Sequence, residues 1–264
     1  MERAVIAFSF DDGRLDNYTN AYPILKKYHL PATFNITSGY IKNEVDRELF
    51  EFPLPMTESM VQELYADGHY EIAGHGCKHI NTAEDIVTGI QDLCQMLHTD
   101  QLTSEGNGFA SPGSDLTKEM YNGMKSVLDA NHFCYVRISC RYKSHSKLKR
   151  YLRKASRIVK WPWIYKVAYQ DTLMDKVEDN ILYSIPVLSS VTTKQMKAVI
   201  QAAIEQKKVC VLMFHSIIPR ESIRNSWDYP TDSFESICRF LSEYQEKKQL
   251  EVTTVMNAYS LLKK

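Results

Sequence analysis

The residues best suited to chemistry stand where apolar runs of the chain end. The first run, Ala4–Phe10, leads directly into two acids, Asp11 and Asp12, and a glycine. Because successive side chains of a strand point to opposite faces, the two carboxylates can serve different purposes. We expect one of them to bind a metal ion and the other to handle a proton.

Three histidines follow later apolar runs. His75 and His79 are four residues apart, and glycines on both sides of His75 let the backbone approach closely. His215 ends the run Leu212–Phe214. Zinc and similar ions bind imidazole nitrogens and carboxylate oxygens, and a catalytic site leaves one position open. Taken singly, a turn, a surface histidine pair and a core histidine explain these motifs. Their recurrence after successive strands favours a metal site.

The elements that must position these residues alternate between strand and helix. Strands are expected at 4–10, 32–37, 69–74, 108–110, 132–139, 181–187, 209–214 and just after 250. Helices are expected at 19–29, 58–67, 82–99, 116–130, 192–206, 232–247 and at the end of the chain. Seven or eight such units predict an α/β fold with a closed or nearly closed parallel barrel. In such a barrel the loops after the strands share one rim, where the acids and histidines would meet.

Composition narrows the possible partners and compartments. The 32 basic and 32 acidic residues cancel, so no global field recruits nucleic acid and none is expected as a partner. The six cysteines are scattered without a C-x-x-C pair, which is typical of free thiols in a reducing compartment. The chain as given shows no leader pattern and no apolar run of membrane-spanning length, so we expect a cytoplasmic protein.

At this point the motifs resemble those of the polysaccharide deacetylases, which are metal-dependent carbohydrate esterases. Four segments carry the resemblance: Ser9-Phe10-Asp11-Asp12-Gly13, His75-Gly76-Cys77-Lys78-His79, Ala110-Ser111-Pro112-Gly113 and Leu212-Met213-Phe214-His215. The similarity runs from about Val5 to about Leu241. It implies a distorted (β/α)7-type barrel, with residues 1–264 forming a single deacetylase-like domain.

The resemblance also implies roles for individual residues. Asp12, His75 and His79 would bind a divalent metal, with zinc the expected ion although such sites accept others. Asp11 would be the general base for the attacking water, and His215 the general acid for the leaving amine. The backbone near Pro112 and Gly113 would help to hold the oxyanion. The implied reaction is hydrolysis of an N-acetyl group, less readily an O-acetyl group, on a sugar or polysaccharide.

The sequence departs from the family pattern in three places. Ala110 stands where the family has an arginine that pairs with the catalytic base; Arg137 is our candidate substitute, and Arg14 is a second. Gly76 stands where serine or threonine is usual. No clean match exists for the acid and tryptophan that orient the catalytic histidine, and Trp227 is expected to line the substrate groove instead. The alternative is therefore a catalytically weakened domain that binds glycans or a membrane surface.

A basic insertion at about 141–180 lies outside the family pattern. Residues 141–166 contain ten lysines and arginines, no acid, and interspersed leucine, isoleucine and tryptophan residues. One interpretation is a solvated helical excursion over the barrel rim. The other is an amphipathic element that contacts an anionic membrane or an acidic glycan, which would place the protein at the inner face of the membrane. The segment 40–56, with Phe50 and Phe52, is expected to be a loop, and its role is open, as is the oligomeric state.

Overall fold

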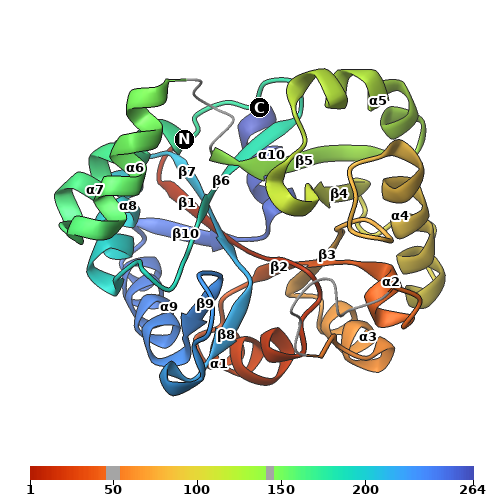
Figure 1. Cartoon of the computed structure of the whole chain (residues 1–264), viewed down its shortest axis with the longest axis horizontal. Coiled ribbons are helices and arrows are strands. Elements are labelled where there is room, and N and C mark those ends of the chain that lie inside the picture. Colours follow the sequence, from red (N-terminus) through yellow and green to blue (C-terminus); the bar gives the residue numbers. More distant parts are fainter. Residues whose placement is uncertain (46–53, 141–145) are drawn as a thin grey trace.

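A closed barrel of parallel strands forms the centre of the molecule. The computed structural model describes residues 1–45, 54–140 and 146–264, so Phe50 and Phe52 of the predicted loop lie outside the described residues. The barrel strands are β1 (Ala4–Phe10), β2 (Ala32–Ile36), β3 (Tyr70–Gly74), β4 (Asn107–Ala110), β5 (Phe133–Ser139), β6 (Ile181–Pro186) and β7 (Val209–Phe214). They follow one another in chain order, and β1 pairs with β7 to close the ring (Figure 1). The predicted single-domain (β/α)7-type barrel is confirmed.

One extra strand distorts the barrel. β1 pairs with β2 only through Ser9 and Phe10, whereas β10 (Leu250–Thr253) pairs with β1 over Ala4–Ala7. The barrel is therefore splayed at the N-terminal end of β1, and β10 fills the opening. The helix that follows, α10 (Val255–Lys263), packs its apolar side against β1, β6 and β7 there.

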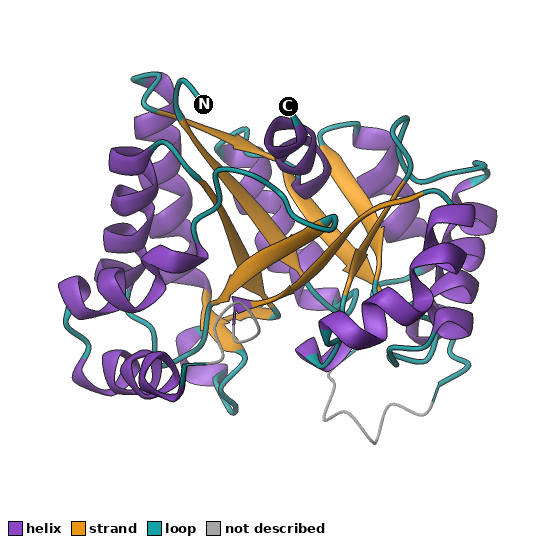
Figure 2. Ribbon diagram, turned by 90° about the horizontal axis from the view of Figure 1, so that it is seen from above, coloured by secondary structure: helices purple, strands orange, loops and turns teal. Residues whose placement is uncertain are grey.

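Helices surround the strands, as Figure 2 shows. They are α1 (Tyr22–Lys27), preceded by a π-helical turn, α2 (Ser38–Ile41), α3 (Glu58–Asp67), α4 (Ala83–Leu97), α5 (Lys118–Ala130), α6 (Lys147–Val159), α7 (Pro162–Tyr169), α8 (Thr193–Gln206), α9 (Thr231–Glu246) and α10. Five of them, α3, α4, α5, α8 and α10, begin after a threonine whose hydroxyl accepts a backbone N–H in the first turn. Such caps satisfy donors that have no partner inside the helix, so the sequence fixes these starts closely. No helix in the described ranges has the length and apolar character needed to cross a membrane.

Two short features differ from the expected pattern. Tyr40 and Ile41, the first two residues of the region expected to be a loop, lie in the helix α2, and a small parallel pair, β8 (Ser216–Ile218) with β9 (Asp228–Pro230), follows β7. Elements of three or four residues give too few positions for a hydrophobic period to appear. The β8–β9 pair matters for the site because it holds Trp227 close to the end of β7.

The basic segment forms the connection between β5 and β6. Its second helix, α7, buries Tyr165, Ala168 and Tyr169 in the main core and packs against α8. This helix therefore takes the place of an ordinary crossover helix. The first helix, α6, is an additional one that packs mainly on the outside of α7.

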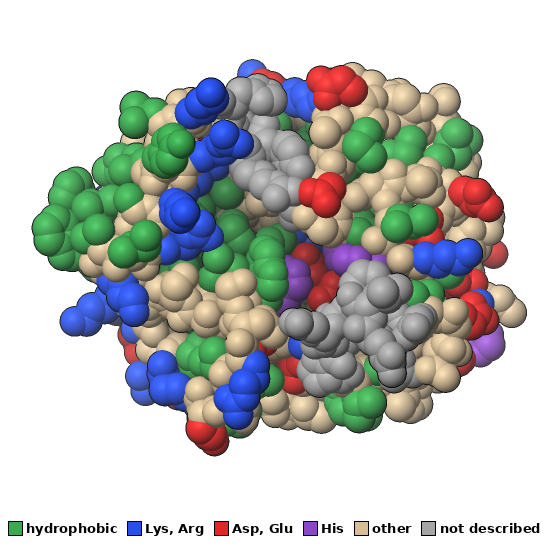
Figure 3. Space-filling model, viewed as in Figure 1, with side chains coloured by type: hydrophobic (Ala, Val, Ile, Leu, Met, Phe, Trp, Pro, Cys, Tyr) green, Lys and Arg blue, Asp and Glu red, His purple; other side chains and the backbone are tan. Residues whose placement is uncertain are grey.

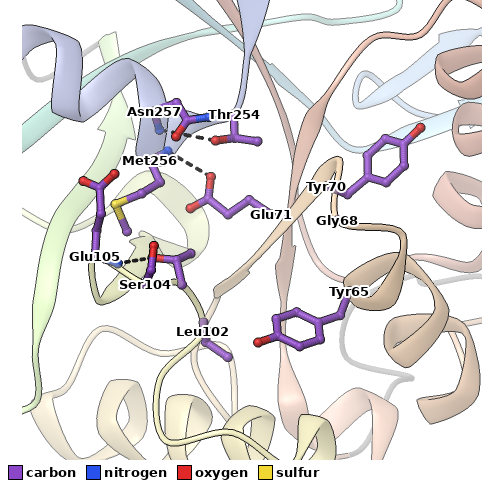
Figure 4. Close-up of a pocket in the computed structure, with 11 residues that line it drawn as sticks. Tyr65, Gly68, Tyr70, Glu71, Leu102, Ser104, Glu105, Thr254, Met256 and Asn257 are labelled. Atoms are coloured by element: carbon purple, nitrogen blue, oxygen red, sulfur yellow. Dashed lines mark hydrogen bonds between the residues drawn. The ribbon is translucent and has the colours of Figure 1, made fainter.

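A cavity of about 240 Å³ lies at the opposite end of the strands from the acids and histidines, between the starts of β3 and α10 (Figure 4). The carboxylate of Glu71, which is buried beside it, accepts hydrogen bonds from the Thr33 and Tyr135 hydroxyls and from the backbone N–H of Met256. Glu71 thus caps the N-terminus of α10 and ties it to the barrel.

Candidate active site

The first strand delivers its two carboxylates in different directions. Asp12 adopts a φ of 80° and Gly13 a φ of 75°, so the chain turns sharply through the left-handed region directly after β1. A left-handed backbone at a non-glycine residue is strained, and such strain is concentrated at functional sites. The turn directs Asp12 toward His75 and His79, and Asp11 toward Arg137 and His215.

Asp12, His75 and His79 form a cluster suited to a metal ion. Oδ1 of Asp12 lies 3.3 Å from Nε2 of His75 and 3.4 Å from Nε2 of His79, and one ligand atom from each residue lies within 4.8 Å of the others. Nδ1 of His75 is 2.8 Å from the carbonyl oxygen of Ala110, which fixes Nε2 as the atom that faces the cluster. Metal-binding histidines commonly hold their second nitrogen in this way, so the residues fit a divalent cation.

The loop that carries the two histidines is held by one buried acid. The carboxylate of Asp85, in the first turn of α4, accepts the backbone N–H groups of Cys77, Lys78 and Ile80. Gly76 has a φ of 80°, and a Cβ there would lie 2.4 Å from Oδ2 of Asp85. Glycine at this position, unusual for the family, is therefore required by the way this chain builds the loop.

The charges of the cluster reinforce one another. Burial raises the pKa of Asp12, but its hydrogen bonds with His75 and His79 outweigh burial and hold that pKa well below its usual range. Burial lowers the pKa of His75, but the carboxylates of Asp11 and Asp12 outweigh burial and raise it. Asp12 is thus an ionised carboxylate at neutral pH, as a metal ligand must be.

Arg137 supplies the arginine for Asp11 that is absent at Ala110. Its guanidinium lies 2.5 Å from Oδ1 of Asp11, and both side chains are buried. Arg137 on β5 is the register partner of Ala110 on β4, so the two side chains share one face of the sheet on neighbouring strands. Arg14 instead lies 3.7 Å from Asp12 and 3.3 Å from Asp16. Of the two candidate arginines, only Arg137 contacts Asp11.

Two residues of the site were missed in the sequence. Asn35 on β2 is buried and donates its side-chain N–H to Oδ1 of Asp11 at 2.8 Å. The ring of Tyr40 in α2 stacks against His79 with centroids 6.1 Å apart. A polar residue inside the apolar run of β2 was the available signal for Asn35; nothing in the sequence marked Tyr40.

His215 lies on the other side of Asp11. Its Nε2 is 3.9 Å from Oδ2 of Asp11, and its ring lies 4.4 Å from that of Trp227, centroid to centroid. Burial lowers the pKa of His215, although the carboxylates of Asp12 and Asp11 act in the opposite direction. Asp228 accepts backbone N–H groups of Arg224 and Asn225, so it stabilises the loop before β9.

The turn after β4 is tied to the histidine loop. Pro112 and Gly113 lie in a single 3₁₀ turn, and Gly113 has a φ of 57°. Asn81, two residues after His79, donates its side-chain N–H to the carbonyl of Pro112 at 2.9 Å. From the outside, histidine and acidic side chains are seen at the floor of a central hollow (Figure 3).

The comparisons with known proteins agree with this arrangement. The family model for polysaccharide deacetylase matches residues 1–127. The N-terminal part of the chain is therefore similar to the polysaccharide deacetylase family. The matched part includes Asp11, Asp12, both histidines of the cluster and the Pro112–Gly113 turn, whereas Arg137, His215 and Trp227 lie beyond it.

The matches to individual curated proteins and solved structures are more limited. A poly-beta-1,6-N-acetyl-D-glucosamine N-deacetylase of Staphylococcus aureus is 37% identical over 67 residues, which cover 25% of this chain and 22% of that protein. The match thus spans about a fifth of the length of these curated relatives. Among solved structures, IcaB from Ammonifex degensii has 24% identity and a TM-score of 0.39 over 49% of this chain and 57% of that chain. The peptidoglycan deacetylase PdaC from Bacillus subtilis has 12% identity and a TM-score of 0.47 over 98% of this chain and 91% of that chain.

Proposed function

We propose that this protein is a metal-dependent carbohydrate deacetylase that hydrolyses N-acetyl groups on a sugar polymer or oligomer. One observation carries the proposal: the Asp12–His75–His79 cluster lies directly beside an acid–arginine pair, Asp11 and Arg137. A divalent cation bound by the cluster, zinc in our proposal, would polarise the acetamide carbonyl and lower the pKa of a water molecule.

Asp11 is the proposed general base. Arg137 and Asn35 both donate to its Oδ1, which leaves Oδ2 directed toward the side of His215. A carboxylate fixed in this way can accept a proton from an attacking water without rotating. Arg137 acts as a positioning residue, because it holds Asp11 and lies away from the open side of the site.

His215 is the proposed general acid, and its ring would donate a proton to the leaving sugar amine. It is aligned by contact with the ring of Trp227, whose exposed indole would also face the sugar. Aromatic side chains present an apolar face that packs well against a sugar ring. The backbone at Pro112 and Gly113 is the proposed contact for the oxyanion.

The substrate proposed is an N-acetylated glycan. The relative from Staphylococcus aureus is named for its action on poly-beta-1,6-N-acetyl-D-glucosamine, and the aligned portion of this chain is short. The alternative, a glycan-binding domain without turnover, was suggested by Ala110 and Gly76. Two observations argue for turnover instead. Arg137 pairs with Asp11 in place of an arginine at Ala110, and the glycine at Gly76 is explained by the closeness of the Asp85 carboxylate.

Acetate release tests the proposal. Zinc-loaded protein is incubated with N-acetylglucosamine oligomers of β-1,4 and β-1,6 linkage, and acetate is measured. We expect release by the wild type and loss of release in Asp11→Asn, which keeps all three proposed metal ligands. Bound zinc without acetate from either linkage in the wild type would favour the binding-domain alternative.

A further inference from the structure

Helix α6 has its apolar face turned to solvent. Leu148, Tyr151 and Ile158 follow one another at helical spacing and are 77%, 70% and 71% exposed. The opposite side of the helix buries Arg153 and Ser156. An amphipathic helix normally places its apolar side inward, so α6 is inverted apart from Leu152, which is partly buried against the core.

The inversion is fixed by specific bonds. The guanidinium of Arg153 donates to the carbonyl oxygens of Cys140 and Ala168 and to the carboxylate of Asp171 at 3.0 Å. Lys149, on the same side of α6, lies 2.7 Å from Asp171. Rotating α6 to bury its apolar side would break these bonds and leave the carbonyl oxygens of Cys140 and Ala168 without the donor that satisfies them.

The apolar surface continues into α7. Trp161 and Trp163 are 55% and 62% exposed, and their rings stack 6.2 Å apart. We define the α6–α7 patch as Leu148, Tyr151, Ile158, Val159, Trp161, Trp163 and Val167. These seven are more than half of the thirteen large hydrophobic residues exposed in the described chain. Such a concentration marks an interaction surface.

The surroundings of the patch are positively charged. Lys147, Arg150, Lys154, Arg157 and Lys160 lie on α6 or directly after it, and residues 146–166 contain no acid. Figure 3 shows hydrophobic side chains gathered at the left edge of the molecule, over α6 and α7, with Lys and Arg side chains between them and the central hollow. The partner that fits has an apolar interior and an anionic surface.

We propose that the α6–α7 patch docks on an anionic lipid bilayer. Paired tryptophans suit the boundary between headgroups and acyl chains, and the bordering lysines and arginines suit anionic headgroups. A second copy of the chain fits less well, because a symmetric interface would bring the same basic border against itself. The inference stands apart from the deacetylase proposal, since none of its residues belongs to the site around Asp11 and Asp12.

Vesicle sedimentation tests the docking. The full chain is mixed with vesicles of phosphatidylcholine alone, or of phosphatidylcholine and phosphatidylserine, and the pelleted fraction is measured. We expect the wild type to pellet with the mixed vesicles and to remain in solution with phosphatidylcholine. Leu148→Ser/Ile158→Ser should weaken the partition coefficient about tenfold or more. The matched control, Met120→Ser/Val127→Ser, changes two residues on α5 that are 41% and 42% exposed and should bind like the wild type.

A second set of measurements separates charge from apolar contact. Lys147→Glu/Lys154→Glu should also weaken binding to the mixed vesicles about tenfold or more, and brominated lipid should quench tryptophan emission in the wild type. No sedimentation of the wild type, or equal losses in the patch and control variants, overturns the proposal. So does a concentration-dependent dimer, measured by analytical ultracentrifugation, that the Leu148→Ser/Ile158→Ser variant abolishes; the patch would then be a contact between copies.

Discussion

At the residue scale, the two neighbouring acids of the site are distinguished by what surrounds them. Asp11 receives hydrogen bonds from Arg137 and Asn35, whereas Asp12 faces two imidazoles. The left-handed turn at Asp12 produces this division, because it swings one carboxylate away from the other. Adjacent carboxylates with different partners can act as a ligand and a base in one site.

Replacing Arg137 tests whether the acid–arginine pair matters for turnover. Arg137→Ala removes the donor that holds Asp11 and leaves the Asp12 cluster intact, so we expect turnover to fall about a hundredfold with unchanged metal content. Arg137→Lys keeps the charge without the planar fork and should recover part of the rate. Initial rates and metal analysis of the folded variants provide the measurement.

Arg14 provides the contrasting variant. Because Arg14 lies beside Asp12, Arg14→Ala should change metal affinity more than it changes turnover at saturating metal. If Arg137→Ala retained full turnover, the assignment of Arg137 as the partner of the base would be wrong.

The sequence could indicate these residues only to different degrees. The acids and histidines are visible because each follows a strand of predictable extent. The proximity of Arg137 to Asp11 depends on the register between β4 and β5, which no local pattern encodes. Asp85 and Asn35 resemble ordinary helix and strand residues, and only the fold shows that they hold the loop and the base.

At the element scale, the histidine loop depends on α4. The Asp85 carboxylate accepts three backbone N–H groups of the loop and is not one of the three residues of the cluster. Asp85→Ala should therefore weaken metal affinity about tenfold to a hundredfold, as other changes behind metal ligands do. Competition with a fluorescent zinc chelator measures the affinity.

The neighbouring acid gives the control for Asp85. Glu84 lies in the same first turn of α4 and is exposed, so Glu84→Ala removes the same charge from the helix start and leaves the hydrogen bonds from the loop to Asp85 in place. Equal weakening in both variants would mean that helix electrostatics, rather than the loop contacts, account for the effect.

The anchor of α6 should depend on pH. Burial raises the pKa of Asp171, but Lys149 and Arg153 outweigh burial and lower it below its ordinary 3.8. A lowered folded-state pKa contributes stability that is present above the unfolded value and is lost as the pH falls through the folded value. Hydrogen exchange of α6, corrected for intrinsic rates, should therefore lose protection only below about pH 4.

Two variants check this pH dependence. Asp171→Asn should leave α6 weakly protected at every pH, because the charge of the anchor is absent throughout. Asp232→Asn removes another carboxylate of lowered pKa, on α9 and paired with Arg220, and should leave α6 as in the wild type. Strong acid-stable protection of α6 in Asp171→Asn would contradict the role given to the anchor.

At the scale of the whole molecule, the ring of strands could be predicted and its distortion could not. Helices with recognisable caps alternate with apolar runs in the sequence, so the order of strands and helices could be predicted. Parallel pairing of the strands could be inferred from that order. The distortion arises because β10 pairs with the first part of β1 and β2 with its last two residues. This arrangement depends on contacts between residues almost 250 positions apart, such as Ala4 with Leu250. Similarly, the orientation of α6 depends on the carbonyl oxygens and the carboxylate that Arg153 contacts in the fold. The sequence pattern of α6 alone would equally suit a helix whose apolar side faces the core.

Metal binding should stabilise the entire barrel. The proposed ligands come from the ends of β1 and β3 and the loop beyond, so a cation would join strands that are separated in the ring by β2. A ligand at about a hundred times its dissociation constant contributes about 2.7 kcal/mol when it binds only the folded state. For a chain of this size, that corresponds to roughly 5–10 °C in Tm. Scanning calorimetry with zinc or with a chelator measures the shift.

Variants of the two adjacent acids decide where the ion binds. Asp12→Asn should abolish the zinc-dependent rise in Tm, and asparagine is suitable there because it tolerates the left-handed backbone at this position. Asp11→Asn should retain most of the rise, since Asp11 faces Arg137 rather than the cluster. A zinc shift that survived in Asp12→Asn would place the ion elsewhere in the molecule, and the division of roles between the two carboxylates would then be lost.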